Sequence, residues 1–158
     1  MKETIPSWTC EYDLKENREI YLKLINEVFD AGRLLLGEQL ENFERNFSNY
    51  IGTNYAVGCD NATNALFLIL KSIGVKPGDE IITVSNTAIP TVSAIRQANA
   101  NPVFVDINKH GLMDINNVLS LINKRTKAII VVHLYGYPLD LTELLQLKNK
   151  RDLTIIED

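Results

Sequence analysis

Apolar residues in the first third of the chain recur at helical spacing. Between Asp13 and Ala31 a set of apolar residues recurs at helical spacings, which predicts a helix that stops at Gly32; the set is Leu14, Tyr21, Leu24, Ile25 and Val28. A second helix is predicted to follow Gly37 and to end at Gly52, because glycine is common just past a helix end. Its apolar stripe consists of Leu40, Phe43, Phe47 and Tyr50.

Beyond Gly52 the pattern changes to short apolar runs that begin 22 to 26 residues apart. The runs are rich in Val and Ile and show no polar alternation, which is typical of strands covered by helices on both faces. We therefore expect repeated strand–helix units that form a parallel sheet with right-handed crossovers. The runs are Tyr55–Cys59, Glu80–Val84, Pro102–Asp106, Lys127–Val132 and Leu153–Glu157.

Capping residues predict helices between these runs. Residues from Asn61 to Ile73 are apolar on one helical face. Pro90 suits the first turn of a helix that follows the second run. Asp114 is a good N-cap for a helix through Ile122, and Asp140 can play the same part for residues 141–147.

The predicted fold class is α/β, a parallel-rich sheet flanked by helices, with a helical segment over residues 1–52 and the sheet domain over residues 53–158. Open sheets of this kind bind their ligands at the carboxyl ends of the strands. The last run reaches such an end at Asp158, with no helix after it. We therefore expect the sheet domain to be incomplete and the chain to be the N-terminal part of a longer protein.

The composition is that of an ordinary packed domain, with 46% hydrophobic and 23% charged residues among 158. Sixteen Lys and Arg against twenty Asp and Glu give a net charge of −4, which argues against nucleic acid or an anionic membrane as partner. No apolar run in the sequence approaches the ~20 residues that cross a bilayer. Cys10 and Cys59 form no paired metal or redox motif, and the first residues do not follow a signal-peptide pattern. We expect a cytoplasmic protein without a metal site.

Two polar segments at predicted strand ends are candidate ligand sites. In Gly58–Ala65, small and hydrogen-bonding residues precede a helix whose free N–H groups and dipole suit a phosphate. The alternative is that Asn61 or Thr63 only caps the helix, and the glycine spacings of dinucleotide and P-loop motifs are missing. In Val84–Thr91, hydroxyl and amide side chains form either a polar pocket or an ordinary loop.

Two further candidates follow the later strands. His133–Pro138 contains one His and two Tyr, which either perform acid–base chemistry or stabilise a loop. Glu157 and Asp158 end a hydrophobic strand, where a carboxylate is costly to bury without a cationic partner. A metal, a substrate amine and a protonated cofactor nitrogen are candidate partners, and two solvated carboxylates are the alternative.

Short motifs follow one another from Ala31 to Asp158. They are Gly32–Gly37, Phe43-Glu44, Tyr50–Gly52, Ala56-Val57, Ala62–Leu66, Pro77–Ile82, Asn101–Asp106, Thr126–Ile129, His133–Gly136 and Ile155–Asp158. Together they resemble the DegT/DnrJ/StrS-type nucleotide-sugar aminotransferases, which depend on pyridoxal 5′-phosphate (PLP). The resemblance implies the large-domain fold of the fold-type-I aminotransferases.

The resemblance also implies roles for particular residues. Ala62, Thr63 and Asn64 take the positions of the family's phosphate-binding segment, which surrounds the PLP phosphate, with Ala62 in place of the usual Gly. Asp158 matches the aspartate that pairs with the protonated pyridine nitrogen and keeps the ring an electron sink. Ala88 stands where the family commonly has an aromatic residue that stacks on the ring, so stacking must be weaker or come from elsewhere.

The activity implied is transfer of an amino group, with an amino acid such as glutamate as donor, to a nucleotide-linked keto sugar, in amino-sugar biosynthesis by a homodimer. The family's Schiff-base lysine lies downstream of the Asp158 motif, and no lysine of this chain occupies its motif. We therefore expect the chain to be inactive alone. Two alternatives are a non-catalytic or regulatory protein of this fold, suggested by Ala88, and an α/β ligand-binding or signalling domain.

Overall fold

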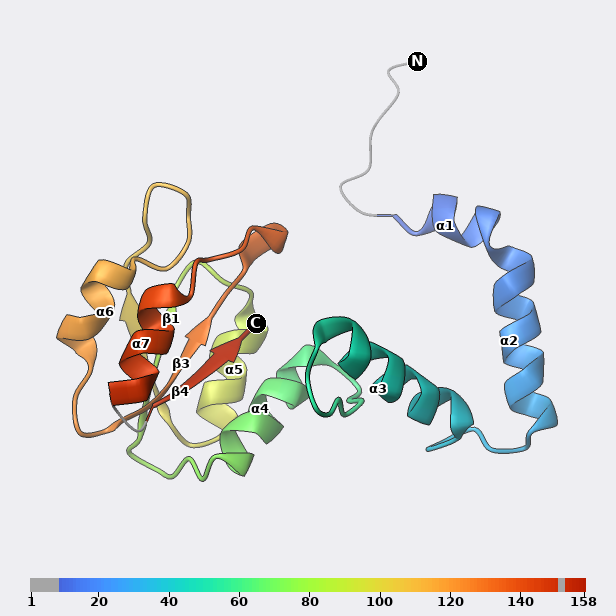
Figure 1. Cartoon of the computed structure of the whole chain (residues 1–158), viewed down its shortest axis with the longest axis horizontal. Helices are drawn as coiled ribbons and strands as arrows, with labels where there is room; N and C mark the ends of the chain where they lie inside the picture. The colour runs from blue at the N-terminus through green and yellow to red at the C-terminus, as the bar shows by residue number, and fades with distance from the viewer. Residues whose placement is uncertain (1–8, 151–152) are drawn as a thin grey trace, which may run out of the picture. The chain divides into compact units, whose positions relative to one another are not determined.

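The computed structural model describes residues 9–150 and 153–158 (Figure 1). The chain divides into two compact units, Met1–Gly58 and Cys59–Asp158. The first unit contains the helices α1 (Glu11–Glu16), α2 (Arg18–Asp30) and α3 (Glu38–Ile51).

The helix predicted over residues 13–31 is present as α1 and α2, which are divided at Asn17. Asn17 adopts φ −105° and ψ 10°, and its side chain donates a hydrogen bond to Asp13 Oδ1 at 2.8 Å. The N–H group of Asn17 still donates to Asp13 O at 2.9 Å and its carbonyl accepts from the N–H group of Tyr21 at 3.0 Å, so only this local change in ψ divides the two helices. The second predicted helix is α3, and it ends at Gly52 with φ 80°, a left-handed conformation that favours glycine.

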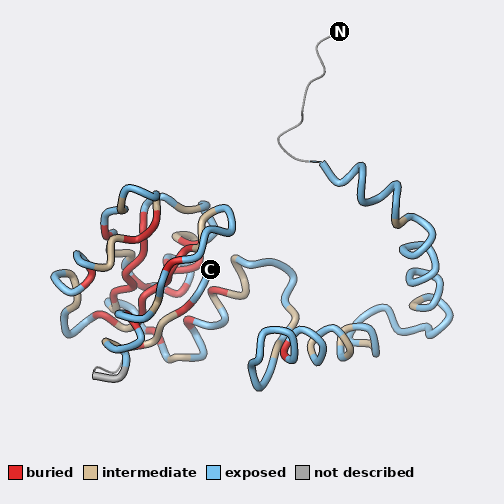
Figure 2. The backbone as a smooth tube through the Cα atoms, turned by 45° about the horizontal axis from the view of Figure 1, so that its top comes forward, coloured by how far each residue is buried: buried red, intermediate tan, exposed pale blue. Residues whose placement is uncertain are grey.

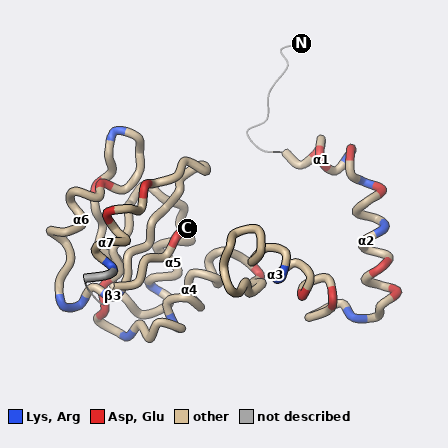
Figure 3. Tube along the Cα trace, viewed as in Figure 1, with Lys and Arg blue, Asp and Glu red and all other residues tan. Residues whose placement is uncertain are grey.

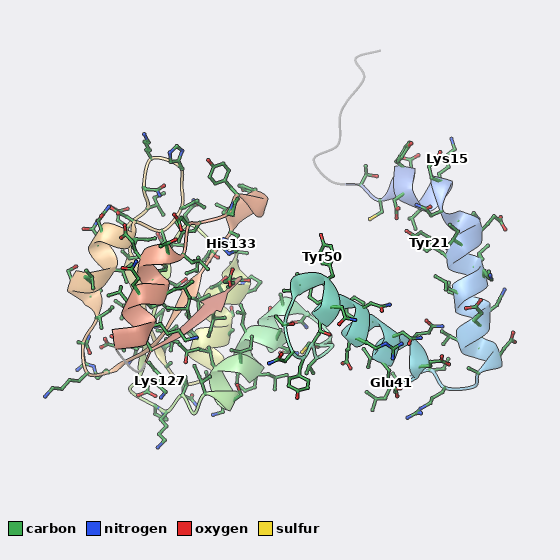
Figure 4. The ribbon with its side chains drawn as sticks, in the orientation of Figure 1. Lys15, Tyr21, Glu41, Tyr50, Lys127 and His133 are labelled. Atoms are coloured by element: carbon green, nitrogen blue, oxygen red, sulfur yellow. The ribbon has the colours of Figure 1, made fainter. Side chains whose placement is uncertain are left out.

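The helices of the first unit bury very little. Neither α1 nor α2 contains a buried residue, and in α3 only Ser48 is buried. Figure 2 accordingly draws most of this unit in the colour of exposed residues, and Figure 4 shows the ring of Tyr50 extending away from α3. Large exposed apolar side chains of this unit include Leu14, Ile20, Leu24, Ile25, Phe29, Leu34, Leu35, Leu36, Phe43 and Phe47.

The second unit is a four-stranded parallel sheet flanked by helices, which confirms the predicted fold class. The strand order is β2-β1-β3-β4. Four of the five predicted strands are present, and their bounds shift by at most one residue at either end. In chain order the elements are α4 (Ala62–Ser72), β1 (Glu80–Val84), α5 (Ile89–Gln97), β2 (Asn101–Val105), α6 (Ile115–Leu121), β3 (Thr126–Val131), a short 3-10 turn (Leu134–Gly136), α7 (Thr142–Lys150) and β4 (Thr154–Glu157).

Helices α4 and α5 cover one face of the sheet, and α6 and α7 cover the other (Figure 1). Successive residues of a strand point to opposite faces, so Ile81 packs with α4 and α5 while Ile82 packs with α6 and α7. The edge strands β2 and β4 are partly exposed, whereas the residues of the central strands β1 and β3 are almost fully buried on both faces, as Figure 2 shows for the middle of this unit. Their continuous apolar sequence follows from this two-sided burial.

The predicted strand at residues 55–59 does not form. The segment is irregular, and the N–H group of Gly58 donates a hydrogen bond to Glu44 Oε1 of α3 at 2.7 Å. A strand is stable only where a neighbouring strand satisfies its backbone groups, and the sheet of the described residues does not include this segment. Its apolar sequence alone therefore did not determine its structure.

Candidate cofactor site at the carboxyl edge of the sheet

The strand order places a topological switch point between β1 and β3. From β1 the chain first adds β2 on one side, and then returns to add β3 and β4 on the other side. Open sheets bind their ligands outside the carboxyl ends of the strands at such a point. The polar segments Ser85–Ala88, after β1, and His133–Gly136, after β3, begin at this edge, and Asp158 directly follows the neighbouring strand β4 there.

The two carboxylates that end β4 lie on opposite faces of the sheet. Ile156 belongs to the core with α4 and α5, whereas Ile155 packs against the core with α6 and α7. Because side chains alternate along a strand, Asp158 shares the face of Ile156 and Glu157 shares the face of Ile155. Only Asp158 is therefore on the same face as the helices α4 and α5.

The position of Asp158 is fixed through both its backbone and its side chain. Its N–H group donates to Val131 O at 2.8 Å, and its carbonyl oxygen accepts from the N–H group of His133 at 2.9 Å. Its Oδ2 accepts a hydrogen bond of 2.6 Å from the hydroxyl of Thr91, a residue of α5 that is 1% exposed. Among the described residues no other side chain bonds this carboxylate, so Oδ1 is available to a ligand at an exposed position.

The first turn of α4 faces the same edge. After α4 the chain turns back into β1 through a turn in which the N–H group of Asp79 donates to Lys76 O at 3.1 Å, and Figure 1 shows α4 running in the opposite direction to β4. The helical pattern leaves the N–H groups of Ala62 and Thr63 without a partner inside the helix. These groups and the helix dipole favour an anion at this end of α4.

Asn61 is the N-cap of α4, as one of the alternatives from the sequence predicted. Its Oδ1 accepts from the N–H group of Asn64 at 2.9 Å. The Asn64 amide in turn donates to both carboxylate oxygens of Asp60, at 3.0 and 2.8 Å. Of the three residues predicted to bind the phosphate, Asn64 is thus already hydrogen-bonded to its neighbours, whereas Ala62 and Thr63 offer backbone N–H donors.

Ala88 is the N-cap residue of α5 and is exposed, with Pro90 in the first turn as predicted. Its methyl group offers far less surface than an aromatic ring would. The loop before it is held by Asn86, whose Nδ2 donates to Gly111 O at 3.0 Å and so ties the loop after β1 to the loop between β2 and α6. The Val84–Thr91 segment is therefore partly a structural loop.

His133, labelled in Figure 4, has both ring nitrogens in hydrogen-bond contact. Its Nδ1 accepts from the N–H group of Leu139 at 3.1 Å, and its Nε2 lies 3.1 Å from Glu157 Oε2. These bonds fasten the 133–139 loop to β4 and support the structural alternative for His133. The Glu157 partner lies 24 residues away, so no local sequence signal identified it.

The distribution of charge and the search for metal-binding side chains bear on which ligands the described residues could hold. Figure 3 shows Lys and Arg dispersed along the chain rather than gathered on one element. No group of three His, Cys, Asp or Glu side chains in the described part of the chain could hold a metal ion. Within the same residues, no helix has the length and apolar character needed to span a membrane.

These residues fit PLP. The carboxylate of Asp158 has one oxygen free to pair with a protonated ring nitrogen, and the N-terminal turn of α4 offers backbone donors to a phosphate. Both groups belong to the same face and the same edge of one sheet. An anion site and a carboxylate are the two kinds of group that the charged ends of the cofactor require.

Comparison with known proteins gives concordant matches. The chain is 45% identical over 152 residues to the dTDP-3-amino-3,4,6-trideoxy-alpha-D-glucose transaminase of Micromonospora megalomicea subsp. nigra, covering 96% of this chain and 41% of that protein. The crystal structure of DesV from S. venezuelae superposes with a TM-score of 0.93 at 38% identity, over 97% of this chain and 42% of that one. NtdA from Bacillus subtilis, with bound cofactor PMP, gives a TM-score of 0.86 at 32% identity, over 90% and 33%.

The chain thus spans about two fifths of the length of the relatives that it matches. A sequence model of the DegT/DnrJ/EryC1/StrS aminotransferase family matches residues 15–158. This match covers nearly all of the chain, including every residue of the site described above. The chain belongs to the DegT/DnrJ/EryC1/StrS aminotransferase family.

Proposed function

We propose that this chain is part of a PLP-dependent aminotransferase that transfers an amino group from an amino acid such as glutamate to a keto sugar carried by a nucleotide. The M. megalomicea relative, named as a transaminase of a dTDP-linked amino sugar, supports the substrate class. The observation that carries the proposal is the exposed Asp158 carboxylate, fixed on the same sheet face as α4, whose N-terminus favours an anion.

PLP, when bound, supplies an electron sink for negative charge that develops on the substrate carbon. The residues of this chain would bind and orient it. Asp158 would keep the ring nitrogen protonated by charge pairing, and the N–H groups of Ala62 and Thr63 would hold the phosphate. We assign the Schiff-base lysine to no residue of this chain, and we propose that the rest of the protein and a second copy of it complete the site.

The test is the substitution Asp158→Asn in the full-length protein. We expect PLP to remain bound and kcat with a nucleotide keto sugar to fall roughly 100-fold, the usual scale for losing one preorganised electrostatic partner. Glu157→Gln is the matched control, because it removes the same charge one residue away on the opposite face of the sheet; its kcat should stay close to that of the native protein.

Unchanged turnover for Asp158→Asn would exclude Asp158 as the ring partner. A native full-length protein that binds PLP but turns over no keto sugar would support the regulatory alternative instead. A protein that does not bind PLP at all would support the ligand-binding alternative.

A further inference from the structure

We propose that Thr91 is a positioning residue that holds the Asp158 carboxylate in place for the cofactor, and that Thr87 holds Thr91 in turn. The inference rests on the proposed function and adds to it a role for α5. It follows from two hydrogen bonds that connect the end of β1, the first turns of α5 and the end of β4.

The direction of these hydrogen bonds follows from the chemistry of the groups. An ionised carboxylate only accepts, so the hydroxyl of Thr91 donates its hydrogen to Asp158 Oδ2 at 2.6 Å. The Oγ1 atoms of Thr87 and Thr91 are 2.8 Å apart. Because the hydrogen of Thr91 is already used, Thr87 must be the donor of this second bond. The three side chains therefore form an ordered chain from Thr87 to Thr91 to Asp158.

The backbone alone cannot fix the carboxylate. The two bonds to β3 hold the main chain of Asp158, but the last torsion angle of an aspartate side chain is broad and allows its oxygens to rotate. A short hydrogen bond to a charged acceptor is about twice as strong as a neutral one, so the bond from Thr91 selects one orientation. With Oδ2 engaged, Oδ1 is the oxygen left for the ring nitrogen.

Burial makes Thr91 suited to this task. Thr91 is 1% exposed, and its neighbours on α5, Ala94 and Ile95, are fully buried in the core against the sheet. Its hydroxyl is therefore shielded from water, which would otherwise compete for the hydrogen bond. The partner Asp158 lies 67 residues further along the chain, so the contact depends on the assembled fold.

The test compares Thr91→Val, Thr91→Ser and Thr83→Val in the full-length protein. Valine keeps the shape of threonine without the hydroxyl, and serine restores the hydroxyl. Thr83 is buried on β1 and its hydroxyl has no partner among the described residues, so Thr83→Val makes the same chemical change without breaking a hydrogen bond. The readouts are the dissociation constant of PLP and the 15N resonance of ring-labelled PLP, which reports protonation of the ring nitrogen.

We expect Thr91→Val to weaken PLP binding roughly tenfold, the scale of one hydrogen bond to a charged group, and to shift the 15N resonance towards the unprotonated form. Thr91→Ser and Thr83→Val should both retain the native resonance. Thr87→Val should shift it in the same direction as Thr91→Val and by a smaller amount, because Thr91 keeps its bond to Asp158.

A native resonance and affinity in soluble Thr91→Val would overturn the inference while leaving the proposed function intact. A native protein that binds no PLP would overturn both. If Thr91→Val proves insoluble, a crystal structure of the native protein with PLP decides the matter. Thr91 must then contact one oxygen of Asp158 while the ring nitrogen contacts the other, and a rotated Thr91 overturns the inference.

Discussion

At the scale of single residues, two buried polar side chains of β1 differ in what they contribute to stability. The Glu80 carboxylate accepts hydrogen bonds from Asn123 Nδ2 at 2.6 Å and from Arg125 Nε at 2.7 Å. Thr83 Oγ1 has no partner among the described residues. A buried polar group costs free energy unless it is hydrogen-bonded, so substitutions at these two positions should act in opposite directions.

We expect Thr83→Val to raise the free energy of unfolding of the 158-residue chain by about 1 kcal/mol, because it removes an unsatisfied hydroxyl and keeps the packing. Urea denaturation measures the change. Thr126→Val is the matched control. Thr126 is also buried, but its hydroxyl accepts from the N–H group of Asn123 at 2.9 Å, so its loss should be destabilising. A destabilised Thr83→Val would show that the hydroxyl has a partner in solution.

Glu80 should make stability depend on pH. The hydrogen bond from Asn123, followed by that from Arg125, lowers the pKa of the Glu80 carboxyl. Since the folded chain then holds the carboxylate more strongly than the unfolded chain does, this contribution is present above the ordinary glutamate pKa of about 4.3 and is lost as the pH falls through the lower folded value. Thermal melting between pH 7 and pH 3 should show a smaller loss of stability for Glu80→Gln than for the native chain.

The control for Glu80 is Glu143→Gln, which removes one negative charge from the exposed surface of α7. It should melt with the native dependence on pH. If Glu80→Gln loses as much stability in acid as the native chain does, the contacts with Asn123 and Arg125 do not persist in solution.

At the scale of the elements, two helix caps allow a direct comparison. Asn61 accepts from the N–H group of Asn64 at the start of α4, and Asp114 accepts from that of Asn116 at the start of α6. We expect Asn61→Ala and Asp114→Ala each to lower the free energy of unfolding by about 1 kcal/mol, as measured by urea denaturation. Only Asn61→Ala should also change the affinity of the full-length protein for PLP. If both variants bind PLP with the same affinity, the Asn61 cap does not contribute to the cofactor site.

The helix boundaries that the sequence predicted correctly are those with local signals. The caps at Asn61 and Asp114 and the left-handed glycine at Gly52 act within a few residues, and the helices start and end as they indicate. The run at residues 55–59 has the same apolar character as β1 but forms no strand. A strand requires a partner strand, and apolar spacing does not identify that partner.

The same distinction applies to the candidate site. Alternation along β4 separates Glu157 from Asp158, and this could be read from the sequence once β4 was predicted. The hydrogen bond from Thr91 to Asp158 and the contact of His133 with Glu157 join residues 67 and 24 positions apart. Their partners are set by the strand order, which sequence periodicity does not specify.

At the scale of the whole molecule, the two units differ in how much apolar surface they bury. Every buried hydrophobic side chain among the described residues lies between Leu66 and Ile156, in the second unit. The first unit instead leaves exposed the apolar side chains of α2, of α3 and of the Leu34–Leu36 segment between them. Exposed apolar area on this scale is typical of interaction surfaces.

We therefore expect residues 59–158 alone to keep one cooperative thermal transition, since they contain both core clusters. The 158-residue chain should self-associate more strongly than this shorter chain. The edge strands β2 and β4 are present in both, so the difference reports on the first unit. Light scattering at matched concentrations measures the difference in self-association. The double substitution Phe29→Gln and Leu35→Gln in the longer chain should reduce association, because these side chains are 64% and 82% exposed. A monomeric 158-residue chain would contradict the role of these residues, and a shorter chain without a cooperative transition would show that its core depends on the first unit.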